Sequence, residues 1–332
     1  MTMDRRVFVG TGMAGAAMLT TGGVFAQQPL KQTFFAGVVA SAPRPAGAAG
    51  AAGRGAAGAP AAPAAAGAAA GRAAQTDQQR VDSFLLGMDD ASRIGIHNIE
   101  KSNGPDPLTN IYAGRESAYK AELDKRNLKL AGLANNCHAG RAELKQAMIA
   151  QNLKTARFVK AMGGNYIALV LDPTEGSDAS GDEAAFRKLD YKVIAANVDE
   201  MARTSKEETG IEVGYHPEDG DSAAGLVDYL MENTKYLRFF PDIGWMQMAG
   251  MDSVAVCKKY YSRINGFHLR DYVMPTTPAQ GRGIVPLGQG TIDLMALMTF
   301  LRQQKFTGYV MGEGVGNQSN YDYMHGVLGL QF

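Results

Sequence analysis

The chain has 332 residues, enough for one large barrel or two average domains. Its 33 basic residues balance its 33 acidic ones, and the body of the chain contains no basic run. This composition argues against nucleic acid and against a charged membrane surface as partners.

The first 26 residues are typical of an export signal. Asp4-Arg-Arg-Val-Phe8 supplies paired arginines, the segment from Val9 to Val24 is mildly apolar, and Val24-Phe-Ala26 suits a small-residue cleavage site. The arginine pair resembles a twin-arginine signal, whose route carries proteins that have already folded. A Sec signal or an uncleaved anchor is the alternative. We expect a periplasmic protein with no stable membrane insertion after signal removal, since no later stretch is apolar enough to span a bilayer.

A strand-like segment and a low-complexity tract come next. Within residues 27–41, Thr33-Phe-Phe-Ala-Gly-Val-Val-Ala40 is the strand-like part. Residues 42–76 consist almost wholly of Ala, Gly and Pro and have no apolar face to pack, which predicts a disordered loop. This tract is either a linker behind an N-terminal arm or an enlarged loop inside the fold.

Helical and strand-like segments alternate over residues 77–332, which favours a parallel sheet with crossover helices. Apolar residues at i, i+3 and i+4 predict helices over 141–162 and 188–209. Seven strands are predicted near 93–99, 127–134, 165–171, 211–215, 236–242, 264–268 and 307–311. Closure needs an eighth strand, and residues 33–40 are the remaining candidate. We therefore predict a single-domain (β/α)8 TIM barrel with the Ala/Gly/Pro-rich tract inserted after strand 1.

Four polar residues follow predicted strands in chain order, namely His216, Asp242, His268 and Glu313. The gaps between them are 26, 26 and 45 residues, and one strand-plus-helix unit is about one eighth of roughly 250 residues. Because the carboxyl ends of barrel strands meet at one mouth, these side chains should converge there. Two imidazoles and two carboxylates would make a divalent-metal site.

Each of these residues has a structural alternative. Asp242 could cap the following helix by accepting backbone N–H bonds, and Glu313, between two glycines, could lie in a solvent-facing turn. A lone histidine after an apolar strand is more often structural than a ligand, but Arg270 and Asp271 crowd the strand end that carries His268. Asp271 could orient the imidazole, and Arg270 could bind a substrate oxygen.

Several further residues are candidates for the mouth of the barrel. Of His216, Glu218 and Asp219, one could be a ligand or a proton carrier, and Trp245 suits stacking on a sugar face. His138 lies at the end of the third predicted strand. His138 is one of the weaker candidates, each more typical of a structural or solvated side chain; the others are His97, Glu100, Asp172 and Glu175.

The remaining motifs narrow the chemistry. Cys137 falls at a predicted strand end and Cys257 inside a predicted helix, so we expect two free thiols rather than a disulfide. Gly288-Gln-Gly-Thr-Ile-Asp293 predicts a turn into the last helix, with Asp293 near its start. The chain has no Ser/His/Asp elbow, phosphate-cradling glycine loop or paired Cys motif, which disfavours acyl transfer and nucleotide chemistry.

Five segments, taken in order, resemble the xylose isomerase-like TIM-barrel superfamily. That superfamily includes sugar phosphate isomerases and epimerases, inosose dehydratases and apurinic-site endonucleases. The resemblance covers residues 77 to about 332 and is firmest over 188–315. The segments are Gly214-Tyr-His-Pro217, Pro241-Asp-Ile-Gly244, Phe267-His-Leu-Arg-Asp271, Gly288 to Asp293, and Gly312-Glu313.

The resemblance implies a Mn2+, Co2+, Mg2+ or Zn2+ ion held by Asp242, His268 and Glu313, with three departures. His216 stands where epimerases of the family have Glu, although other branches have a Tyr-His pair there, so a two-glutamate proton transfer is not implied. Trp245 stands where many relatives have His, which argues against the multi-zinc endonuclease branch. Arg270 stands where Lys is common, and its forked guanidinium would grip an oxygen differently.

The expected function is a metal-dependent isomerase or epimerase acting on a carbohydrate or polyol. It would remove a proton next to a carbonyl through a metal-stabilised enediolate, with Glu313 or His216 as the base. Arg270, Trp245, His138 and Glu218 are the predicted substrate-binding residues. A keto-glycoside or inosose-type lyase or dehydratase, and a non-catalytic sugar-binding barrel, are the alternatives. The partner is a small-molecule carbohydrate, unphosphorylated if the protein is exported, and a homo-oligomer is left open.

Overall fold

The computed structural model describes residues 31–40, 77–102, 108–173, 181–275, 283–314 and 316–332. The chain divides into two units at Lys31, and every described helix and strand belongs to the second, Gln32–Phe332. The predicted export signal and the Ala/Gly/Pro-rich tract lie outside the described residues.

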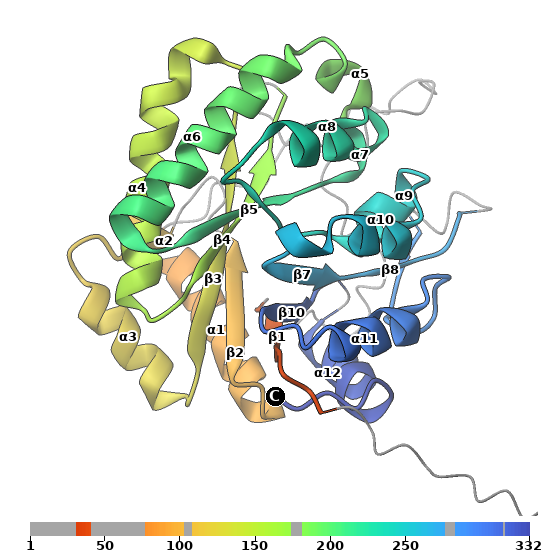
Figure 1. The fold of residues 1–332 in the computed structure, drawn as a ribbon. Coiled ribbons are helices and arrows are strands. Elements are labelled where there is room, and N and C mark those ends of the chain that lie inside the picture. The colour runs from red at the N-terminus through yellow and green to blue at the C-terminus, as the bar shows by residue number, and fades with distance from the viewer. Residues whose placement is uncertain (1–30, 41–76, 103–107, 174–180, 276–282, 315) are drawn as a thin grey trace, which may run out of the picture. The chain divides into compact units, whose positions relative to one another are not determined.

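Eight parallel strands in the second unit form a nearly closed barrel (Figure 1). They follow one another in the hydrogen-bonded order β6-β5-β4-β3-β2-β1-β10-β7. Two bridges, Phe239 to Ile264 and Asp242 to His268, join the ends of this order. The predicted TIM barrel is confirmed, including its first strand between residues 33 and 40. The strands are β1 (Phe35–Val39), β2 (Asn98–Ser102), β3 (Lys129–Cys137), β4 (Tyr166–Leu171), β5 (Glu212–His216), β6 (Arg238–Phe239), β7 (Gly266–Leu269) and β10 (Tyr309–Gly312).

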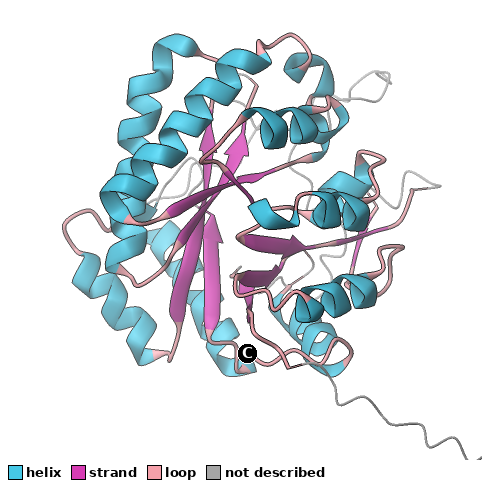
Figure 2. Ribbon diagram, in the orientation of Figure 1, coloured by secondary structure: helices cyan, strands magenta, loops and turns pink. Residues whose placement is uncertain are grey.

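Helices surround the strands (Figure 2). The predicted helices at 141–162 and 188–209 correspond to α4 and α6. The helices are α1 (Asp77–Ile94), α2 (Leu108–Ile111), α3 (Glu116–Lys125), α4 (Lys145–Ala161), α5 (Glu183–Phe186), α6 (Tyr191–Thr209), α7 (Asp219–Ala223), α8 (Leu226–Asn233), α9 (Ile243–Met248), α10 (Ser253–Lys259), α11 (Leu294–Gln303) and α12 (Asn317–Gly326). The short strands β8 (Asp271–Tyr272) and β9 (Ile284–Val285) pair antiparallel beyond β7.

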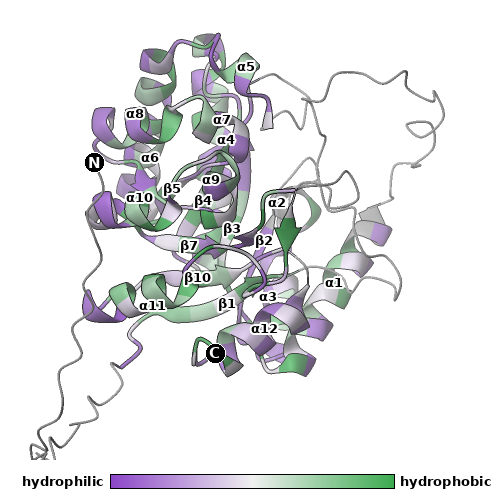
Figure 3. Cartoon of the chain, turned by 90° about the vertical axis from the view of Figure 1, so that its right-hand side faces the viewer, coloured by the Kyte–Doolittle hydropathy of each residue, from purple (hydrophilic) through white to green (hydrophobic). Residues whose placement is uncertain are grey.

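Helix α11 shows how the outer layer packs on the barrel. Its buried side chains are Leu294, Leu297, Met298 and Leu301, at the three- and four-residue spacing of one helix face. Most residues of this helix, LMALMTFLRQ, are hydrophobic, and its ribbon is largely green (Figure 3). Asp293 accepts a hydrogen bond from the backbone N–H of Ala296 and so caps the helix start, as the sequence predicts. None of the helices in the described part of the chain is both long and apolar enough to cross a membrane.

The second strand differs from its predicted position at 93–99. Helix α1 continues through Ile94, and Gly95, with φ +93°, ends it in the left-handed conformation that favours glycine. Strand β2 therefore begins only at Asn98. The shift moves Glu100 from beyond the strand into its centre, where it is fully buried.

The inside of the barrel holds a small apolar cluster, separate from the larger core between strands and helices. Its members are Ala131, Tyr166, Ala168, Phe240 and Met311. Tyr166 and Phe240 stack with ring centres 4.7 Å apart. Glycines make room for both rings, since a Cβ at Gly132 would overlap Tyr166 and one at Gly266 would overlap Phe240. This cluster adjoins the polar residues of the mouth, because Phe240 packs edge-on against the His268 ring.

Candidate active site

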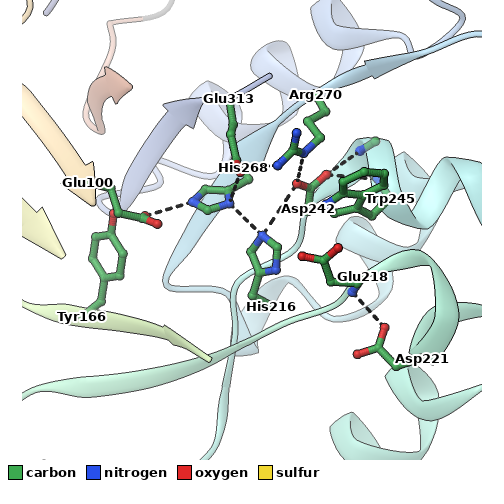
Figure 4. Close-up of polar contacts among 11 residues, drawn as sticks. Glu100, Tyr166, His216, Glu218, Asp221, Asp242, Trp245, His268, Arg270 and Glu313 are labelled. Atoms are coloured by element: carbon green, nitrogen blue, oxygen red, sulfur yellow. Dashed lines mark hydrogen bonds and ion pairs between the residues drawn. The ribbon is translucent and has the colours of Figure 1, made fainter. Parts of the chain in front are cut away.

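The barrel brings together the four residues that the sequence singles out as metal ligands (Figure 4). His216 ends β5, Asp242 follows β6, His268 lies in β7, and Glu313 directly follows β10. One potential ligand atom from each side chain lies within 4.8 Å of all the others. Strands separated by tens of residues therefore deliver four donors to one point.

His268 is the centre of this group. Its Nδ1 atom lies 2.7 Å from Nε2 of His216 and 2.8 Å from Oε2 of Glu313. Its Nε2 atom lies 2.9 Å from Oε2 of Glu100. Burial lowers the pKa of this imidazole, but the carboxylates of Glu100 and Glu313 outweigh burial and raise its pKa to about 10. Without a cation, His268 is therefore positively charged at neutral pH.

Asp242 uses its two oxygens for different purposes. Oδ1 accepts hydrogen bonds from the backbone N–H groups of Gly244 and Trp245, at 2.9 and 3.0 Å, and so caps helix α9. Oδ2 accepts from Nε of Arg270 at 2.7 Å and lies 3.6 Å from Nε2 of His216. Burial raises the pKa of Asp242, but Arg270 and His216 together lower it by more, so this pKa lies below its usual value. The helix cap and the position in the polar cluster, which are alternatives at the level of sequence, occur together.

Arg270 links the two carboxylates of the cluster. Its guanidinium pairs with Asp242 and with Glu313, and its Cζ lies 4.6 Å from the ring centre of Trp245. Trp245 is 5% exposed, so the guanidinium lies over the indole face that the sequence assigned to a sugar. A Cβ at Gly244 would collide with the Arg270 side chain, so glycine is needed for this close approach.

Only one of the four predicted ligands is reachable from outside. The side chain of Glu313 is 23% exposed, whereas those of His216, His268 and Asp242 are 3% exposed or less. Burial raises the pKa of Glu313, but Arg270 and His268 outweigh it and hold this pKa well below the usual range. Glu313 is therefore an ionised carboxylate facing the mouth.

Glu218 lies beside the cluster without belonging to it. Its carboxylate points toward Asp242 and His216 (Figure 4), and its backbone N–H donates to Oδ1 of Asp221 at 2.8 Å. Burial raises the pKa of Glu218 to about 7. A carboxyl group with such a pKa can exchange a proton near neutral pH.

Asp271 does not have the role expected from the sequence. The prediction that it orients the His268 ring is wrong, because Glu100 occupies Nε2 of that ring. The Asp271 carboxylate instead accepts backbone N–H bonds of 2.9 Å from Tyr272, Gly288 and Gly290. It orders the turn that leads into α11.

The remaining candidates lie outside the four-residue group. His138 follows β3 and is partly buried, and its Nδ1 has no hydrogen-bond partner within the described ranges. Asp172 follows β4 and accepts a 2.9 Å bond from Asn136. His97 is exposed at the amino end of β2, away from the mouth. Glu175 lies outside the described residues.

The two cysteines agree with the sequence prediction. Cys137 ends β3 and Cys257 lies in α10, and both are buried free thiols. Burial raises the pKa of Cys137 to about 12, so this thiol stays protonated and unreactive.

The cluster fits a divalent cation by its chemistry. Imidazole nitrogens and carboxylate oxygens are the ligands of Zn2+ and related ions, at bond lengths of about 2.0–2.2 Å. Four such atoms within 4.8 Å of one another are close to the spacing around one ion. The proton on His268 supplies the positive charge that a cation would otherwise bring to Glu313 and Glu100.

The fold and the cluster together define a (β/α)8 barrel with a candidate metal site at the carboxyl ends of its strands. The sequence profile described as "Xylose isomerase-like TIM barrel" matches residues 88–326. The chain belongs to this family.

Individual relatives extend this picture. Inosose dehydratase of Clostridium perfringens is 27% identical over 183 residues, which are 47% of this chain and 59% of that enzyme. The chain thus matches somewhat more than half the length of this curated relative.

Two solved structures share the fold. A xylose isomerase-like TIM barrel protein from Mycobacterium smegmatis in complex with magnesium is 13% identical, with a TM-score of 0.58 over 75% of this chain and 88% of its own. The 3-keto-D-glucoside 4-epimerase from E. coli is 17% identical, with a TM-score of 0.52 over 74% of this chain and 94% of its own. At these identities the likeness establishes the barrel alone.

Proposed function

We propose that this protein is a divalent-metal-dependent isomerase or epimerase that removes a proton next to a carbonyl group of a carbohydrate or polyol. The observation that carries the proposal is the convergence of His216, Asp242, His268 and Glu313 within 4.8 Å at the carboxyl ends of the barrel strands. The magnesium-bound barrel and the keto-glucoside epimerase of the same fold support it.

The residues at the mouth of the barrel have different proposed roles in catalysis. A bound divalent cation would polarise the substrate carbonyl and stabilise the charge that develops on its oxygen. Arg270 keeps Asp242 and Glu313 ionised and holds their carboxylates in place. Glu313 is 23% exposed, so its carboxylate would be accessible to a substrate. Glu218 lies beside the cluster, and burial raises its pKa to about 7, so we assign to its carboxyl group the transfer of the proton.

A dehydratase or lyase is the second candidate function. The inosose dehydratase relative favours it. Such a reaction begins with the same proton removal and ends with the loss of a hydroxyl group. It requires an acid to protonate the leaving oxygen, and Glu218 also lies in position for this step.

If the protein is exported to the periplasm, we expect its substrate to be an unphosphorylated sugar. We propose a periplasmic location on the basis of Asp4-Arg-Arg-Val-Phe8 and the apolar stretch behind it. Replacing Arg5 and Arg6 by Lys should leave the protein in the cytoplasmic fraction of a bacterial host. Equal periplasmic amounts of both forms would contradict the twin-arginine assignment.

One experiment separates the candidates. The purified protein is analysed for bound metal and then incubated in heavy water with free ketoses and keto-glycosides. Isomerisation or epimerisation should place solvent deuterium on a substrate carbon, whereas dehydration should yield an unsaturated or deoxygenated product. Bound metal with sugar binding but neither reaction would identify a non-catalytic binding barrel, and absence of metal from the folded protein would contradict the proposal.

A further inference from the structure

Glu100 connects the candidate metal cluster to the interior of the barrel. It is fully buried in the middle of β2 and faces two donors. The hydroxyl group of Tyr166 donates to Oε2 of Glu100 at 2.6 Å, and Nε2 of His268 lies 2.9 Å from the same oxygen. The other oxygen, Oε1, is buried and has no hydrogen-bond partner in the described part of the chain.

This arrangement determines which nitrogen of His268 keeps its proton when the ring is neutral, as it must be to bind a cation. Oε2 of Glu100 accepts from the hydroxyl group of Tyr166 and also lies within hydrogen-bond distance of Nε2 of His268. A carboxylate only accepts hydrogen bonds, and therefore Nε2 of His268 is the donor. The nitrogen that faces His216 and Glu313 is Nδ1.

We propose that Glu100 is a positioning residue, which holds His268 as its Nε2–H form and thereby presents Nδ1 to the cation. The inference rests on the metal site of the proposed function and adds the atom through which His268 binds. A carboxylate behind a metal-binding imidazole fixes the ring orientation and makes the ring a stronger donor. Tyr166 holds the carboxylate, and the edge of Phe240 supports the ring from the apolar side.

The imidazoles of His216 and His268 differ in the hydrogen-bond partner of the nitrogen that faces away from the cluster. Nδ1 of His216, the nitrogen turned away from His268, is buried and has no hydrogen-bond partner within the described ranges. His216 therefore has no counterpart of Glu100. The orientation of His268 should depend on one identifiable carboxylate, and that of His216 should not.

The first test observes the wild-type protein and uses single His variants only to assign its signals. The chain has five histidines, so the full-length protein labelled with 15N in its imidazoles gives a spectrum simple enough to assign with single His variants. With one equivalent of Zn2+, we expect the signal of His268 to show the metal on Nδ1 and a proton on Nε2. Zn2+ on Nε2 of His268 would overturn the inference while leaving the metal site intact. Absence of Zn2+ binding would overturn the proposed function and this inference together.

The second test compares two replacements of the same side chain. Glu100→Gln keeps an acceptor but removes the charge, and Glu100→Leu removes both. We expect Zn2+ affinity to fall about tenfold in the first and up to about a hundredfold in the second. The His268 ring of Glu100→Leu should also lose its single form and show a mixture of both nitrogens bound. Wild-type affinity in either variant, or an unchanged His268 signal in Glu100→Leu, would refute the role of Glu100.

Tyr166→Phe is the matched control. It removes the other hydrogen bond to the same oxygen without touching His268. Its Zn2+ affinity should fall less than that of Glu100→Gln, and Nδ1 should remain the bound nitrogen. If Glu100→Leu fails to fold, Glu100→Gln and the wild-type spectrum still decide the question.

Discussion

The inside of the barrel contains two neighbouring regions that are built on different principles. The apolar cluster around Tyr166, Phe240 and Met311 is stabilised by close packing, and glycines opposite its rings leave the space for them. The polar cluster around His268 is held together by charge and hydrogen bonds, and Glu313 is its partly exposed member. Changes of volume should therefore affect stability, whereas changes of charge should affect cation binding and activity.

The largest effect is expected at the centre of the polar cluster. His268→Ala removes the group that contacts Glu100, His216 and Glu313 at once. We expect no stoichiometric cation and activity at background, because the cation contributes several kcal/mol of transition-state stabilisation in such sites. Metal analysis and circular dichroism check this outcome, and a folded variant with full metal occupancy would remove His268 from the site.

The next effect separates proton transfer from cation binding. Glu218→Gln is isosteric and leaves the four-residue group untouched. We expect the turnover number to fall roughly 10²–10⁴-fold with the metal content unchanged, since this is the usual contribution of a positioned acid or base. Steady-state kinetics together with metal analysis measure both quantities. Full activity in this variant would reassign the proton transfer to Glu313 or His216.

A change in the apolar cluster should lower the stability of the fold without affecting cation binding. Met311→Ala leaves a cavity inside the barrel and should lower the free energy of unfolding by about 2–5 kcal/mol, with the bound cation retained. Met311→Leu conserves volume and should cost less than about 1.5 kcal/mol. Urea unfolding with metal analysis tests both. Loss of the cation from Met311→Ala would show that the two regions are not separable.

The smallest effect is expected from breaking an ion pair on the outer surface. Arg157 pairs with Glu208 at 2.8 Å, but both side chains are largely exposed. Arg157→Ala should change the free energy of unfolding by less than about 1 kcal/mol and leave the activity unchanged. A larger loss in the same unfolding assay would mean that surface ion pairs matter more in this barrel than exposure suggests.

The sequence was sufficient for the parts of the fold that repeat. The alternation of strands and helices and the need for an eighth strand predicted the barrel and placed β1 between residues 33 and 40. Polar residues after strands predicted the four-residue group, because parallel strands in a barrel must end on one side.

The role of Glu100 could not be predicted from those signals. The sequence pattern predicts the second strand too early, since the apolar residues near Ile94 belong to the end of α1. Gly95 was the available signal, because a glycine after an amphipathic run often ends a helix. The prediction for Asp271 fails for another reason. Its position three residues after His268 suggests a contact with that ring, but its carboxylate accepts hydrogen bonds from backbone N–H groups 17–21 residues further along.

Anomalous diffraction from crystals of the full chain grown with Mn2+ tests the central claim most directly. One strong peak should appear in contact with Nε2 of His216, Oδ2 of Asp242, Nδ1 of His268 and Oε2 of Glu313. A crystal that shows no peak among these atoms, or places the ion elsewhere on the barrel, would contradict the assignment of this cluster as a metal centre.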